Sequence, residues 1–155
     1  MPDIDRHYDY DLFVIGSGPA GQRAAIQAAK LGKHVGLAEQ RNVVGGVCVN
    51  VGTIPSKTFR EAVRQAAGAR QHEVHGGYTG TQQITMTELL RRVSRAVEHE
   101  INVARDQLLR NDIELMVAHA SFVDTHTLRL DSVTDGSSED VTASHIMIAT
   151  GTSAT

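Results

Sequence analysis

Short runs of consecutive apolar residues recur along this chain, and they are the first guide to its secondary structure. Residues 11–15, 35–38 and 113–118 form three such runs, and a fourth over residues 145–151 ends at a glycine. Strands of a parallel sheet are covered on both faces, so they carry near-continuous apolar runs rather than alternating ones. The four runs therefore predict a buried parallel sheet.

Two longer stretches between these runs have the composition and spacing of helices. Residues 19–31 are rich in alanine, and Pro19 fits the first helical turn because its missing N–H needs no partner there. Gly32 follows as a C-terminal stop. Residues 86–110 repeat apolar side chains at the spacing of one helical face, with Thr87 as the candidate cap. Helices that alternate with buried strands are expected to cover the faces of the sheet.

The stretch between these two helices is irregular and rich in glycine. Residues 40–55 predict a loop, and a helix capped by Ser56 is expected to continue to residue 69. Residues 72–81 predict a surface loop. His72 and His75 have an H-x-x-H spacing there, but only one further acidic residue lies nearby, so no metal site is predicted.

Shorter and more polar segments lie between the third and fourth apolar runs. Residues 121–123, 127–130 and 140–142 are separated by turn residues. They predict a small antiparallel β-meander laid over the parallel sheet. The whole pattern indicates an α/β fold of Rossmann-like type, with a central parallel sheet, helices on its faces and this small meander.

Composition narrows the class of protein without defining its chemistry. A chain of 155 residues with 41% hydrophobic content has room for one domain with its own core. The formal charge of −3 gives no reason to expect nucleic acid or an anionic membrane as a partner. Cys48 is the single cysteine, which excludes an internal disulfide and makes a cytoplasmic setting the expectation. Residues 1–10 carry no pattern and are expected to be a loose lead-in.

The first apolar run ends in the spacing Gly16-x-Gly18-x-x-Gly21, and the second ends at Glu39. Such a turn lets the backbone approach a pyrophosphate, whose charge is stabilised by the N–H groups at the start of the following helix. A carboxylate after the second strand can accept hydrogen bonds from a ribose diol and would repel a 2′-phosphate. These residues therefore predict an unphosphorylated adenosine dinucleotide as ligand, either FAD or NAD.

Three segments together resemble a known family. They are the glycine turn with Glu39, the run from Gly45 to Lys57 that contains Val-Cys-Val-Asn-Val-Gly-Thr-Ile-Pro-Ser, and the Ile-Ala-Thr-Gly sequence that ends at Gly151. They resemble the FAD-binding half of the flavoprotein disulfide reductase family, also called the class I pyridine nucleotide-disulfide oxidoreductases. The resemblance covers nearly the whole chain, and it implies FAD as the cofactor.

One departure from the family pattern indicates the subgroup. Disulfide-reducing members carry two cysteines in this loop, whereas here Cys48 stands at the first position and Thr53 at the second. A hydroxyl forms neither a disulfide nor a thiolate contact with flavin, so the chain cannot carry out dithiol chemistry of this type. The pattern is similar to the soluble, Si-specific pyridine nucleotide transhydrogenases. That similarity implies hydride transfer between NADPH and NAD⁺ through FAD, without a redox disulfide.

The resemblance also implies a role for individual residues. Thr53 is expected nearest the flavin ring and Lys57 near its N5 atom, where a cation stabilises reduced flavin; these two are the candidate catalytic residues. The candidate cofactor-binding residues are Gly16, Gly18, Pro19, Ala20, Gly21, Glu39, Gly46, Cys48, Thr53, Lys57, Ala120, Thr150 and Gly151. Among these, Ala120 is expected to meet the adenine, while Thr150 and Gly151 close near the pyrophosphate.

Family members are much longer than this chain, which implies that it carries only part of the functional regions of such an enzyme. Residues 11–155 are expected to be the N-terminal part of the FAD domain, with the NAD(P) domain, the rest of the FAD domain and the dimerisation domain outside it. NADPH and NAD would then bind outside this chain, and the full-length protein would be a homo-oligomer. The expectation is that the chain alone does not catalyse hydride transfer and binds FAD weakly or not at all.

Two other functions remain open from the residues alone. One is an NAD(P)H:acceptor oxidoreductase of the quinone reductase or diaphorase type, related to dihydrolipoamide dehydrogenase. The other is a stand-alone nucleotide-binding module without enzymatic activity, in which Glu39 would hold the ribose of NAD. A flavin absorbance spectrum would separate the enzymes from the module.

Overall fold

A computed structural model describes residues 8–73 and 85–152 of the chain. The elements follow one another in the order β1 (Tyr10–Ile15), α1 (Pro19–Lys30), β2 (Val35–Glu39), α2 (Gly46–Asn50), α3 (Thr53–Glu73), α4 (Met86–Arg110), β3 (Glu114–Phe122), β4 (Thr127–Ser132) and β5 (Ser138–Ile148). This is the predicted α/β fold, with helices and strands mixed along the chain.

The predicted parallel sheet is present. β1 lies between β2 and β5 and pairs with both in parallel, and β2 pairs in parallel with β3. Leu12 marks the register, since it is paired with Val35 on one side and His145 on the other. The carboxyl ends of these strands consequently meet at one edge, where ligands bind in open α/β sheets.

The antiparallel part is built differently from the prediction. β3 runs parallel to β2 up to Val117 and then pairs antiparallel with β4 from Ala118, while β5 pairs first with β4 and then, from Ala143, with β1. The predicted antiparallel meander is thus present in β3, β4 and β5, but expecting its outer strands as separate elements was wrong: residues 121–122 are the end of β3, and residues 140–142 lie in the first half of β5. The five strands close into a small barrel.

Two hydrophobic cores hold the elements together. Phe13 and Leu128 are fully buried inside the barrel, with other side chains of all five strands around them. Val14, next to Phe13, points to the other face of the sheet and packs with Leu37 and with Leu108 of α4. The alternation of neighbouring residues along β1 between two cores explains why this strand carries an unbroken apolar run.

α4 spans the predicted residues, but α2, the bounds of α3 and the cap of α4 differ from the sequence-based expectation. Residues 46–50 form α2 within the stretch expected to be a loop, and α3 begins at Thr53 instead of residue 56. α3 also continues to residue 73, so His72 belongs to a helix; its spacing partner His75 lies outside the described residues. The cap of α4 is Thr85, not Thr87, because the Thr85 Oγ1 atom accepts the Glu88 N–H at 3.2 Å.

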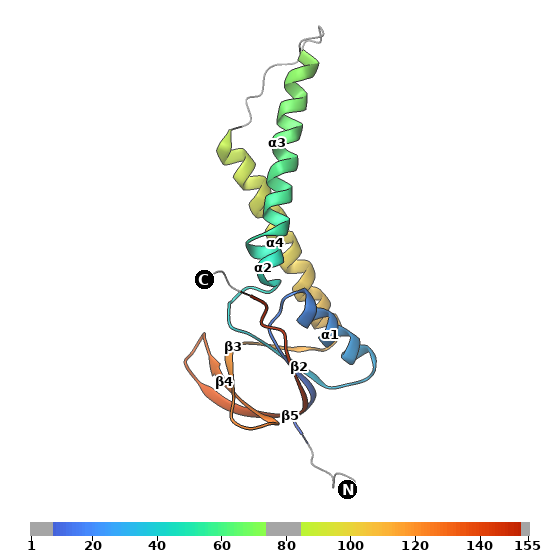
Figure 1. Cartoon of the computed structure of the whole chain (residues 1–155), viewed down its shortest axis with the longest axis vertical. Helices are drawn as coiled ribbons and strands as arrows, with labels where there is room; N and C mark the ends of the chain where they lie inside the picture. Colours follow the sequence, from blue (N-terminus) through green and yellow to red (C-terminus); the bar gives the residue numbers. More distant parts are fainter. Residues whose placement is uncertain (1–7, 74–84, 153–155) are drawn as a thin grey trace.

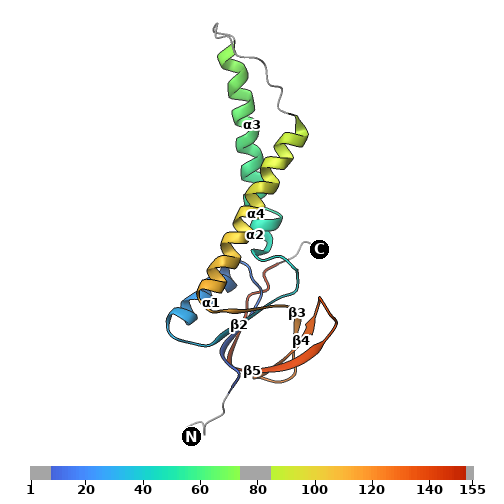
Figure 2. The same ribbon diagram turned by 180° about the vertical axis from the view of Figure 1, so that it is seen from behind.

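The long helices α3 and α4 lie side by side and extend away from the barrel, while α1 packs beside the sheet-proximal end of α4 (Figures 1 and 2). None of the helices in the described part of the chain combines the length and the apolar content that a bilayer crossing requires. At the start of the chain, β1 already includes Tyr10, and the Asp9 carboxylate accepts the Thr142 N–H at 2.8 Å. The expected lead-in is thus partly structured, and residues 1–7 lie outside the described range.

Candidate functional site

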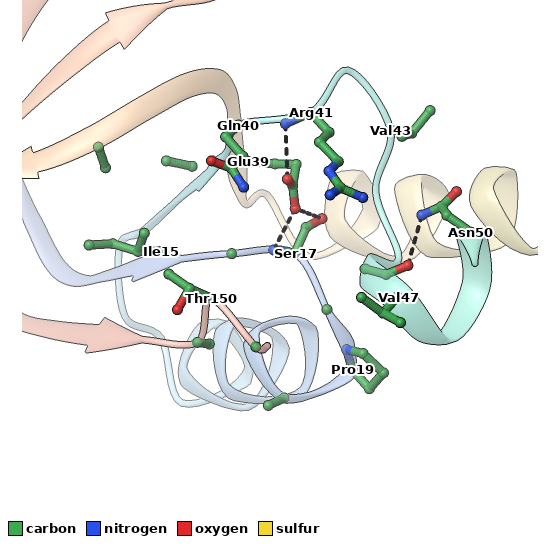
Figure 3. A pocket seen from close by; sticks show the side chains of 18 of the residues that line it. Ile15, Ser17, Pro19, Glu39, Gln40, Arg41, Val43, Val47, Asn50 and Thr150 are labelled. Carbon is green, nitrogen blue, oxygen red and sulfur yellow. Dashed lines mark hydrogen bonds between the residues drawn. The ribbon is translucent and has the colours of Figure 1, made fainter. Parts of the chain in front are cut away.

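A cavity of about 540 Å³ opens at the edge of the sheet where β1, β2 and β5 end and where β3 leaves its parallel pairing with β2. Its volume lies in the range of roughly 300–1,000 Å³ that is usual for small-molecule sites. The turn after β1, the loop after β2, α2 and the segment after β5 form its walls (Figure 3). The cavity thus lies where the strand order predicts a ligand site.

The glycine turn between β1 and α1 forms one wall, and at Gly16 and Gly21 there is no room for a larger residue. Gly16 has a φ of +106°, and a Cβ atom there would lie 2.5 Å from the carbonyl oxygen of Ala149. A Cβ atom at Gly21 would overlap the carbonyl oxygen of Gly16. No side chain caps the N-terminus of α1 at Gly18. The N–H groups at this helix end therefore face the cavity without a side-chain acceptor, which suits an anion.

A second pair of glycines brings α2 against this turn. Gly45 and Gly46 both have positive φ angles, and a Cβ atom at Gly46 would lie 2.9 Å from the Gly18 Cα atom. The Asn50 Nδ2 group donates hydrogen bonds of 3.0 Å to the carbonyl oxygens of Val44 and Gly46. These bonds hold the loop and α2 together, so the backbone of Gly46 stays close to that of Gly18.

Glu39, at the end of β2, is a buried carboxylate with only 8% of its surface exposed, and three hydrogen bonds hold it in place. Its Oε2 atom accepts the backbone N–H of Ser17 at 3.0 Å and the Ser17 hydroxyl at 2.5 Å. Its Oε1 atom accepts the backbone N–H of Arg41 at 3.0 Å. A carboxylate oxygen has two acceptor sites, so Oε1 can still accept a further hydrogen bond from a ligand hydroxyl.

Comparison with known proteins defines the family. The model of the pyridine nucleotide-disulphide oxidoreductase family matches residues 10–155. The chain belongs to this family. Soluble pyridine nucleotide transhydrogenases from Mycobacterium tuberculosis and Escherichia coli O1:K1 are 48% and 37% identical to it, each over 93% of this chain. This confirms the resemblance read from the motifs.

A solved structure is similar as well. It is the Cu(II) complex of a mutant of the HOCl-induced flavoprotein disulfide reductase from Escherichia coli, with a TM-score of 0.76 and 26% identity. The match covers 94% of this chain and 29% of that one. The chain spans 31% of the length of the two transhydrogenases, so it corresponds to less than a third of each relative.

The structure brings most of the predicted site residues of this family member together. Those that line the cavity are Gly16, Gly18, Pro19, Ala20, Glu39, Gly46, Cys48, Ala120, Thr150 and Gly151. Gly21 lies behind the turn and allows it to pack. Thr53 and Lys57 are exposed residues of the first turns of α3 and do not line this cavity. Their assignment to the flavin stays a prediction.

Several residues of the cavity were missed by the sequence-based reasoning. Ser17 and Asn50 act through hydrogen bonds that fix Glu39 and α2, and Arg41 and His119 contribute polar side chains to the walls. Ser17 could have been noticed, since it lies inside the glycine motif and faces the end of β2. The position of Arg41 depends on the path of the loop, for which the sequence carries no periodic signal.

Proposed function

We propose that this chain is the N-terminal FAD-binding part of a soluble pyridine nucleotide transhydrogenase. The observation that carries the proposal is 48% identity with such an enzyme over nearly the whole chain. The cavity at the carboxyl edge of the sheet supports it, because its polar groups are of the kind that bind an adenosine dinucleotide. The cavity alone would suit any ligand of this class.

The residues of the cavity fit the adenosine and pyrophosphate half of FAD. The Gly16 turn and the uncapped start of α1 are suited to the pyrophosphate, and the remaining acceptor site of Glu39 is suited to a ribose hydroxyl. Because its three hydrogen bonds hold the Glu39 carboxylate in place, a 2′-phosphate would meet a fixed negative charge. The cavity should therefore accept FAD or NAD and reject NADP at this position.

The residues of the loop and of α3 define the kind of chemistry. When bound, FAD supplies the hydride transfer between NADPH and NAD⁺. Cys48 has no second cysteine with which to form a disulfide, since Thr53 occupies the position where disulfide-reducing relatives carry one. Lys57 carries a positive charge at the start of α3, and in the proposed enzyme this charge would stabilise reduced flavin.

The rest of such an enzyme would supply what this chain does not contribute. In the proposed division, residues 11–155 form the first part of the FAD domain, and the binding of NADPH and NAD⁺ falls to a region outside it. Homo-oligomer formation and a cytoplasmic setting belong to the same proposal.

The proposal can be tested by following the backbone amides of the ¹⁵N-labelled chain during titration with ADP, FAD and NADP. ADP and FAD should shift the amide signals of Ser17, Gly18 and Arg41, with similar affinity because both present the same adenosine half. NADP should shift them far less. Gly18→Ala is the variant for comparison. No other atom lies within 4 Å of the position of its added methyl group, so the fold should be kept while the methyl group fills part of the cavity.

Two outcomes would count against this function. If millimolar ADP shifted none of these amides in the wild-type chain, the cavity would not be an adenosine site. If the isolated chain with FAD oxidised NADPH at an enzymatic rate, the division of substrates between this chain and another region would be wrong. Absence of turnover together with ADP binding is the expected result.

A further inference from the structure

The charges around the cavity are unevenly distributed. Of the residues that line it, Glu39 carries a negative charge and Arg41 is the side chain with a fixed positive charge. The pyrophosphate of an adenosine dinucleotide is a dianion, and it would enter a cavity that already holds a buried carboxylate. Repulsion between like charges lowers affinity unless a cation is close to both.

Arg41 is held in position by its own backbone. Its N–H donates to the Glu39 Oε1 atom at 3.0 Å, which fixes the start of the loop beside the end of β2. From there the side chain extends into the space between the Ser17 turn and α2 (Figure 3). It is thus directed to the end of the cavity formed by the glycine turn.

The guanidinium group is available to a ligand. Among the side chains that the structure describes, those of residues 8–65 and 85–152, no carboxylate forms an ion pair with it, although Glu39 is close to it in the sequence and in the fold. Glu39 instead turns one carboxylate oxygen to Ser17 and the other to the backbone of Arg41. An exposed guanidinium with five N–H donors in a planar fork is well suited to phosphate oxygens.

We propose that the Arg41 guanidinium binds the pyrophosphate of the dinucleotide and offsets the charge of Glu39; this inference rests on the proposed function. The glycine turn and α1 supply backbone N–H groups on one side of the phosphates, and Arg41 closes the other side from the loop. Arg41 is therefore a binding residue for the phosphates and not for the adenine.

The test compares ligands that share the adenosine but differ in phosphate. Affinities for ADP and for adenosine are measured by calorimetry on the wild-type chain and on the variants Arg41→Ala and Arg41→Lys. Arg105→Ala is the matched control, because it removes the same charge from α4 at a position outside the cavity. Each titration is run at about 50 mM and about 500 mM salt, since screening separates charge from contact.

Arg41→Ala should weaken ADP binding about tenfold at low salt, the loss expected for one charge-assisted hydrogen bond. Its effect on adenosine should stay within about twofold, and the loss for ADP should shrink at high salt because an exposed charge is screened. Arg41→Lys should recover part of the ADP affinity. Arg105→Ala should bind both ligands like the wild type.

Other results would overturn the inference. Equal losses for ADP and adenosine would mean that Arg41 stacks on the adenine or shapes the loop, and an unchanged ADP affinity would mean that it contacts no phosphate. In both cases wild-type binding of ADP would leave the proposed function standing. A wild-type chain that binds neither ligand would overturn the proposed function and this inference together. Melting curves of all variants check that the fold is retained.

Discussion

The carboxylate of Glu39 can be tested as a structural element in its own right, apart from any ligand. The substitution Glu39→Gln keeps the size of the side chain but replaces one acceptor oxygen by an NH₂ group. In the native chain both oxygens accept, from the N–H and hydroxyl of Ser17 and from the N–H of Arg41. Whichever way the new amide is turned, its NH₂ group faces a donor, and at least one backbone N–H loses its acceptor.

The size of the effect follows from these contacts. A buried N–H left without an acceptor costs about 1–3 kcal/mol, and hydrogen bonds to a neutral oxygen are weaker than those to a carboxylate. Removing the charge of a residue that is only 8% exposed returns part of this, because its desolvation is no longer needed. The expected net loss is about 2 kcal/mol in the free energy of unfolding, or roughly 4–8 °C in Tm for a chain of this size.

The assay is urea denaturation followed by circular dichroism, with thermal melting as a second measurement. Glu98→Gln is the control: Glu98 is exposed on α4, so the same change there should alter stability by less than about 0.5 kcal/mol. In a double-mutant cycle with Ser17→Ala, the two losses should be less than additive, because Glu39→Gln weakens or removes the same hydrogen bond that Ser17→Ala deletes. Wild-type stability in Glu39→Gln, or full additivity in the cycle, would refute the account.

Three further tests address the turn, the loop and a surface pair. Gly16→Ala should lower stability by about 3 kcal/mol or more in urea, because of its φ of +106° and the overlap with the carbonyl at the end of β5, whereas Gly18→Ala should keep the wild-type Tm. Asn50→Ala should cost about 1–2 kcal/mol through its two donated hydrogen bonds, and Asn50→Asp, which cannot donate, should cost at least as much. The hydrogen bond to Glu114, more than the one to the backbone, raises the pKa of His34. The stabilisation from this ring is therefore complete below about pH 6.5 and is lost as the pH rises through the raised pKa. Melting curves between pH 5.5 and 8.5 should show that the wild type loses a few tenths of a kcal/mol in the free energy of unfolding and that His34→Gln does not; the loss is small because the ring is half exposed. The same dependence of stability on pH in both chains would contradict this account.

The elements that could be predicted are those whose sequence signal is local. The consecutive apolar run of β1 and the glycine spacing after it describe a strand, a turn and a helix start within about a dozen residues. α4 was predicted to begin and end at the residues observed, because its apolar stripe is long and regular. Its cap was missed by two residues, since Thr85 and Thr87 are equally suited to the role and only the fold selects between them.

The parts that could not be predicted depend on contacts between distant residues. The middle of β3 contains Ala118-His-Ala-Ser121, residues of low strand propensity, so one long strand was read as two short ones. These residues are held in the sheet by pairing with β4, which no local pattern reports. α2 was missed for the same reason: it begins at Gly46, a residue that does not favour helices, and it is stabilised by the Asn50 hydrogen bonds.

The same distinction applies to the cavity. Glu39 was found because its place after β2 is part of a known pattern, and the comparison of motifs added Gly46 and Thr150. Arg41 and His119 lie on the cavity walls only because the loop after β2 and the middle of β3 come together there. Their residue types are common on any surface, so nothing in the sequence separates them from solvated side chains.

The position of β1 between β2 and β5 has a consequence for the order in which the molecule can assemble. Among the described elements β5 is the last strand, yet it pairs with the first, as in Leu12 with His145, and its end lies against the turn at Gly16. During synthesis, β1 remains an unpaired edge on this side until β5 has left the ribosome. Pairings of such long sequence separation form slowly. The nucleotide cavity is therefore completed only after β5 and the residues that follow it have been synthesised, more than a hundred residues after the glycine turn that begins it.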